Sequence, residues 1–147
     1  MIRLPVWVIL LLAGLGACQP DAEPPVVISD VQILAPMPGS SAGVAYMTIS
    51  NNGDASILIS AFRSSQFDRI EMHETRIDAE GISRMNQLGH VEIPADSATE
   101  FIAGGKHLML MGAKPDAKAG SPVTLEIEYN EGLLLVSATL QSRVPTE

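Results

Sequence analysis

The feature that most constrains the fold is the lack of helical periodicity in a sequence full of short β-rich runs. No stretch keeps the apolar repeat of an α-helix for three turns or more. Instead, runs rich in Val, Ile and Leu are bounded by Gly, Pro, Asn and Asp at close intervals. The predicted strands cover residues 26–28, 31–34, 43–50, 56–62, 70–75, 82–85, 99–102, 108–111, 123–129 and 133–140. This spacing predicts an all-β fold, an antiparallel Greek-key sandwich or barrel.

Three turn signals predict how neighbouring strands connect. Residues 51–54 read Asn-Asn-Gly-Asp and predict a hairpin between the strands at 43–50 and 56–62. Residues 78–81 and 130–132 are typical of turns as well. With 147 residues, of which 46% are apolar, the chain is long enough for one domain with its own core. We expect this domain to cover residues 26–141.

The N-terminal residues have the pattern of an export signal. A short basic start at residues 1–3 precedes an apolar run at residues 4–15, which is too short to span a membrane. The run ends in Leu-Gly-Ala-Cys, which resembles a bacterial lipobox. The signal segment at residues 1–18 is therefore expected to end in a lipidated Cys18 that becomes the first residue of the mature protein, with plain secretion as the alternative. Residues 19–25 are rich in Pro and acidic side chains and predict a tether. Residues 142–147 are expected to form a short tail.

The charge and the residue types exclude several classes of function. The formal charge of −8 is unfavourable for binding nucleic acid, because an acidic surface repels phosphate backbones. We find no paired carboxylates at a spacing typical of acid/base catalysis, no phosphate-binding loop and no nucleophile elbow. The sequence therefore favours a binding protein over an enzyme. Cys18 is the only cysteine, so the domain after it has no thiolate to offer a metal.

Two clusters of histidine and methionine contain the candidate metal ligands. The first contains His73 and, further along the chain, Met85; the second contains His107, Met109 and Met111. On a strand, His107, Met109 and Met111 share one face and the two intervening leucines share the other. Because leucines belong in the core, the His/Met face is expected to be the less buried one.

This set of donors suits a soft monovalent metal. Thioether sulfur is neutral and binds Cu(I) better than hard cations, and imidazole adds a stronger donor. Zinc would favour thiolate or carboxylate ligands, and a blue-copper centre requires a Cys ligand. Spacing alone also allows the opposite interpretation, in which the methionines fill the core and the histidines lie on the surface. His90 lies between the two clusters and is not expected to bind metal, and Met72 is expected to point into the core.

The sequence resembles the periplasmic CuA chaperones, the PCuAC family of copper-binding proteins. Eleven residues separate His73 from Met85, twenty-one separate Met85 from His107, and Met109 completes a His-x-Met motif. This spacing matches the family signature. The sequence also resembles that of family members in short blocks at residues 45–51, 72–75, 93–95 and 107–112. The resemblance extends over residues 26–140.

The resemblance implies a cupredoxin-like β-barrel with a Cu(I) site formed by His73, Met85, His107 and Met109. It also implies delivery of Cu(I) to the CuA centre of cytochrome c oxidase, alongside a thioredoxin-fold copper protein. The end of the chain departs from those members that carry a His- and Met-rich tail, which puts a second, Cu(II) site in doubt. We expect a monomer in the periplasm whose only contact with the membrane is the lipid on Cys18.

Two other functions remain open at the level of sequence. A copper-storage or resistance protein would use the same ligands without a specific acceptor. A β-sandwich scaffold module without metal would carry the His/Met face by coincidence, and a failure to take up Cu(I) would identify it.

Overall fold

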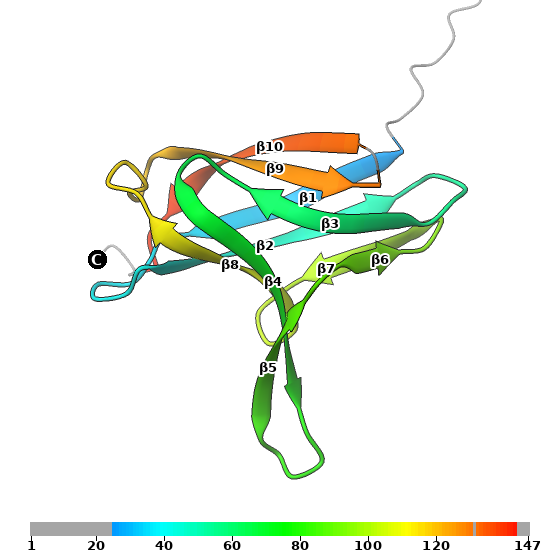
Figure 1. The fold of residues 1–147 in the computed structure, drawn as a ribbon, viewed down its shortest axis with the longest axis horizontal. Coiled ribbons are helices and arrows are strands. Elements are labelled where there is room, and N and C mark those ends of the chain that lie inside the picture. The colour runs from blue at the N-terminus through cyan, green and yellow to red at the C-terminus, as the bar shows by residue number, and fades with distance from the viewer. Residues whose placement is uncertain (1–24, 131, 144–147) are drawn as a thin grey trace, which may run out of the picture.

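The computed structural model describes residues 25–130 and 132–143, and strands form the whole of the regular structure in them (Figure 1). In chain order the strands are β1 (Val26–Leu34), β2 (Ala42–Asn51), β3 (Ile57–Arg63), β4 (Phe67–Ile77), β5 (Ser83–Leu88), β6 (Val91–Ile93), β7 (Ser97–Phe101), β8 (Lys106–Ala113), β9 (Pro122–Tyr129) and β10 (Gly132–Gln141). The all-β prediction is confirmed. The expected signal peptide, Cys18, the tether as far as residue 24 and the tail from residue 144 lie outside the described residues.

The strands form two layers that enclose one core. Hydrogen bonding connects them in the order β5-β4-β8-β7-β2-β1-β10-β9-β3-β6, and β2 also pairs with β8. Most neighbours are antiparallel, whereas β1 with β10 and β7 with β8 are parallel pairs. In Figure 1 the layer that contains β10, β9 and β3 lies across the layer that contains β1, β2 and β8.

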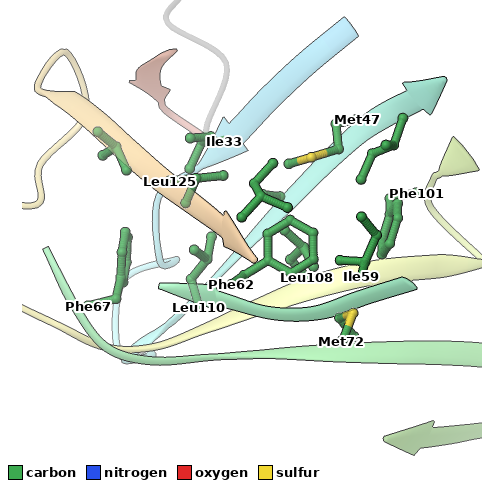
Figure 2. Close-up of a cluster of buried hydrophobic side chains, with 14 of the residues drawn as sticks. Ile33, Met47, Ile59, Phe62, Phe67, Met72, Phe101, Leu108, Leu110 and Leu125 are labelled. Atoms are coloured by element: carbon green, nitrogen blue, oxygen red, sulfur yellow. The ribbon is translucent and has the colours of Figure 1, made fainter. Parts of the chain in front are cut away.

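Alternation along the strands builds the core. On β8, for example, Leu108 and Leu110 are fully buried in the core, whereas Met109 between them is half-buried on the opposite face. Phe62 and Phe101 meet edge to face from the two layers, with ring centroids 5.9 Å apart (Figure 2). Met72 lies in this core, as the sequence predicts.

The predicted hairpin across residues 51–54 is wrong. β2 pairs with β1, β7 and β8, whereas β3 pairs with β6 and β9, so the connection crosses from one layer to the other. Turn residues specify a reversal of the chain, but they do not specify whether the next strand returns to the same sheet. The crossing is held by Asn51, whose buried side chain bonds the backbone of the β2–β3 connection, of Ile93 at the end of β6 and of Pro94 after it.

Two further differences concern strand bounds. The runs at 26–28 and 31–34 belong to one strand, β1, which carries a register shift between Ser29 and Gln32 where Asp30 has a positive φ of 53°. The short strand β6 is absent from the predicted set.

The β4–β5 hairpin extends away from the two layers as an arm (Figure 1). Its turn is the predicted one at residues 78–81, in which the amide of Asp78 donates to the carbonyl of Ile82 over 2.9 Å. β5 pairs with β4 and lies at one edge of the sheet. The arm carries His73 near its base and Met85 on its outer strand, so its position relative to β8 determines whether the predicted ligands meet.

Candidate metal centre

The two histidines lie side by side on neighbouring strands. In the register of β4 and β8, His73 pairs directly with His107. Their ring centroids are 5.9 Å apart and the rings are tilted by 39°. A single ion between them can therefore reach a nitrogen of each ring, because a metal–imidazole bond is about 2.0 Å long.

His107 presents one defined nitrogen. Its Nδ1 lies 3.0 Å from the carbonyl oxygen of Gly105. Because a carbonyl oxygen only accepts, Nδ1 carries the proton and Nε2 keeps its lone pair. His107 is 7% exposed, whereas Met109 and Met111 on the same face are half-buried. The expectation of a less buried face thus holds for the methionines and is wrong for His107, against which the ring of His73 packs.

His73 has one nitrogen bonded and one without a partner. Its Nε2 lies 2.9 Å from Oε2 of Glu71. Its Nδ1 is buried, and no atom of the described residues forms a hydrogen bond with it. A buried polar atom without a partner costs free energy, so such an atom at a cluster of potential ligands indicates a site that a metal would complete.

Met85 and Met109 reach the same hollow as His107. A cavity of about 350 Å³ is lined by these three side chains and by Thr75, which pairs with Met85 across the arm. His73 is not part of the lining and joins the group through its contact with His107. Met85 is 51% exposed and is the most accessible of the four. Met85 from β5 and His107 and Met109 from β8 therefore line one hollow, and His73 from β4 lies next to it, against His107.

Paired charges surround these neutral donors. Arg69 bonds Glu71 at 2.9 Å, and Glu74 lies between Arg76 at 2.7 Å and Lys106 at 3.4 Å. The hydrogen bond from His73, followed by the charge of Arg69, lowers the pKa of Glu71. The hydrogen bond from Arg76 is the main cause that lowers the pKa of Glu74. Both carboxylates are thus ionised and engaged near the site.

The arrangement suits a soft, monovalent ion. Two imidazoles and two thioethers are neutral donors, and a half-exposed methionine would leave a bound ion accessible to an incoming ligand. Nowhere in residues 25–130 and 132–143 do three or more His, Cys, Asp or Glu side chains come together as a metal cluster.

Other sequence candidates lie apart from the hollow or in a different environment. His90 is exposed in the short connection between β5 and β6. Met111 lines a second hollow together with Met109, and its sulfur lies 3.1 Å from Nη2 of Arg69. Met37 is exposed in the β1–β2 connection.

Sequence reasoning missed part of the surroundings of the hollow. Thr75, Tyr46 and Arg143 line it. Alternation along β4 from His73 indicates the face of Thr75. No local signal indicates Arg143, which follows β10 in the segment expected to be a short tail.

An all-β barrel with a His/Met cluster at one edge is a cupredoxin-like domain with a candidate soft-metal centre. Residues 26–136 match the family described as "Putative lipoprotein LpqE-like", and the chain belongs to this family. A relative, "Putative lipoprotein Lxx21020" of Leifsonia xyli subsp. xyli, is 28% identical over 95 residues. The aligned part is 64% of this chain and 57% of the relative, so the chain spans little more than half of that protein's length.

Solved structures of the same fold include two copper-bound proteins. The copper-bound PCuAC domain from PmoF2 superposes with a TM-score of 0.66 at 18% identity, over 82% of this chain and 96% of that domain. The Cu(I) form of DR1885 from Deinococcus radiodurans superposes with a TM-score of 0.65 at 27% identity, over 84% of this chain and 83% of that protein. These likenesses confirm the cupredoxin-like fold. The described residues include no helix with the length and hydropathy needed to cross a membrane.

Proposed function

We propose that this chain is a copper(I) metallochaperone that binds one Cu(I) through His73, Met85, His107 and Met109. The observation that supports it most is the direct pairing of His73 with His107 beside a hollow lined by both methionines. The copper-bound structures of like fold agree with copper as the cargo. The ion is bound and passed on unchanged, so we propose no catalytic turnover.

The weak, separate bonds of thioethers suit transfer. Met85 is half-exposed on the arm, while His107 is buried at the barrel. An acceptor thiolate can therefore displace the Met85 thioether first and the imidazoles last, so that copper remains coordinated throughout the exchange.

The finer part of the proposal concerns acceptor and location. We propose delivery to the CuA subunit of cytochrome c oxidase alongside a thioredoxin-fold copper protein, as the resemblance of the four-residue spacing implies. We also propose a monomer that is tethered outside the cytoplasm through a lipid on Cys18. The descriptions of the family and of the Leifsonia relative as lipoproteins support this tether.

Anaerobic competition for Cu(I) against a chromophoric chelator tests the site. The purified protein should take up one tightly bound equivalent, and His73→Ala and Met109→Ala should each weaken binding clearly. His90→Ala is the matched control, because His90 lies outside the cluster and its loss should leave the affinity unchanged. No uptake, or equal binding by all variants, would instead favour the scaffold interpretation.

Deletion of the gene tests delivery against storage. Loss of oxidase activity under copper limitation is the expected result for a chaperone, and the His73→Ala variant should fail to restore it. Copper sensitivity with normal oxidase activity would show sequestration instead.

A further inference from the structure

Glu71 occupies a central place in a short chain of contacts along one face of β4. Arg69, Glu71 and His73 are two residues apart on this strand, so their side chains share a face. Nε of Arg69 lies 2.9 Å from one carboxylate oxygen of Glu71, and Nε2 of His73 lies 2.9 Å from the other. Each oxygen of the carboxylate thus has its own partner.

These contacts determine where the proton of His73 resides. A glutamate carboxylate is ionised at neutral pH and only accepts hydrogen bonds. In the neutral imidazole, Nε2 of His73 therefore carries the proton and donates it, which leaves the lone pair on Nδ1. This is the atom that is buried without a hydrogen-bond partner among the described residues.

The hydrogen bond of His107 favours the opposite tautomer. Its Nδ1 donates to the carbonyl of Gly105, so its lone pair is on Nε2. One histidine is fixed by a side-chain carboxylate and the other by the backbone. Only the first arrangement can be removed by substitution of a residue that is not itself a candidate ligand.

We propose that Glu71, held by Arg69, is a positioning residue that fixes His73 with its proton on Nε2, so that His73 binds Cu(I) through Nδ1 while His107 binds through Nε2. This inference rests on the proposed function. A carboxylate bonded to the far nitrogen of a histidine ligand sets the orientation of the ring and raises its basicity, and loss of such a partner weakens metal binding.

Arg69 also distinguishes the two methionines on β8. Its Nη2 lies 3.1 Å from the sulfur of Met111, while Met109 lines the hollow beside His107. A guanidinium next to a sulfur disfavours a cation on that sulfur. The residue that holds Glu71 therefore also keeps Met111 out of the ligand set.

The test measures the histidine protons before any copper is added. Long-range proton–nitrogen NMR of the ¹⁵N-labelled apo protein should show His73 protonated on Nε2 and His107 on Nδ1. In Glu71→Leu the signal of His73 should shift towards a mixture of tautomers. In Glu71→Gln it should also shift away from that of the unmodified protein, because the single amide oxygen cannot accept from both Arg69 and His73. Glu74→Gln is the control, because Glu74 bonds Arg76 and Lys106 instead of a histidine.

Copper competition on the same samples completes the test. Glu71→Leu should weaken Cu(I) binding by about 10–100-fold, Glu71→Gln should also weaken it, and Glu74→Gln should leave it unchanged. A proton on Nδ1 of His73 in the apo protein, or a Glu71→Leu variant with unchanged tautomer and affinity, would overturn the role of Glu71. If the unmodified protein binds no Cu(I), the proposed function fails and the ligand role of Nδ1 fails with it, whatever the tautomer.

Discussion

At the scale of single residues, the sulfur atoms of Met109 and Met111 have different neighbours although both lie on one face of β8. Met109 lines the hollow with His107 and Met85, and Met111 contacts Arg69. Leucine has a similar volume and no sulfur, so it removes the donor and preserves packing. Met109→Leu should weaken Cu(I) binding by about tenfold or more, whereas Met111→Leu should change it by less than about threefold. Chelator competition measures both, and equal losses would contradict this ligand assignment.

Asn51 stabilises the connection between the layers through an almost fully buried side-chain amide. Its Nδ2 lies 2.8, 3.1 and 3.0 Å from the carbonyls of Ala55, Ile93 and Pro94, and its Oδ1 accepts from the amide of Gly53. Asn51→Ala would leave these backbone groups without partners, so it should lower the free energy of unfolding by about 2–3 kcal/mol. Urea denaturation measures the loss. The adjacent Asn52 is exposed, and Asn52→Ala should cost far less; a similar loss in both variants would mean that burial of the amide is unimportant.

At the scale of elements, the sequence predicts strands better than it predicts their pairing. Alternation identifies β8 and its two faces, because fully buried leucines flank Met109. The same sequence gives a wrong hairpin at residues 51–54, because the choice between a hairpin and a crossing depends on contacts such as those of Asn51 with Ile93 and Pro94, which are remote in sequence. The pairing of His73 with His107 is likewise a matter of strand register, which no local pattern reveals. Sequence spacing therefore indicates the candidate metal ligands, and strand register shows which of them lie next to each other.

The ionised carboxylate of Asp78 stabilises the turn of the β4–β5 arm. Its Oδ1 accepts from the amides of Ile82 and Glu80, and its Oδ2 accepts from Nε of Arg84 at 2.6 Å. The backbone hydrogen bond from Ile82, then the contact with Arg84, lowers the pKa of Asp78 below the ordinary value of 3.8. Since the folded-state pKa is the lower one, this contribution to stability is fully present above pH 3.8 and is lost as the pH falls through the folded-state value.

An NMR titration of the Ile82 amide checks this assignment. Its resonance should move with a midpoint below pH 3.8 in the unmodified protein, and this transition should vanish in Asp78→Ala. The variant should also show faster amide exchange in β5, because the turn that pairs β5 with β4 loses its side-chain bonds. A midpoint at or above 3.8, or unchanged exchange in β5, would show that Asp78 does not hold the turn.

At the scale of the whole molecule, the candidate site lies where the arm meets the barrel. His107 and Met109 belong to β8, whose other face is the core, whereas Met85 belongs to an edge strand that pairs only with β4 among the described strands. The candidate ligands on β8 are therefore held by core packing, and the candidate ligand on β5 is held mainly by the pairing of the arm. An ion bound to all of them would connect the least constrained element to the most constrained one.

Copper should consequently stabilise the fold and also reduce the local opening of the arm. A ligand that binds the folded state alone contributes about 2.7 kcal/mol when its free concentration is 100 times its Kd. For a domain of this size, such a gain raises Tm by about 5–10 °C. We expect this rise for the unmodified protein under anaerobic Cu(I), together with slower amide exchange in β5, and no rise for His107→Ala relative to its own apo form. Met111→Leu should keep both effects, since its sulfur lies outside the proposed ligand set. A rise in Tm without slower exchange in β5 would mean that copper binds at the barrel without Met85, and the arm would then have no part in holding the ion.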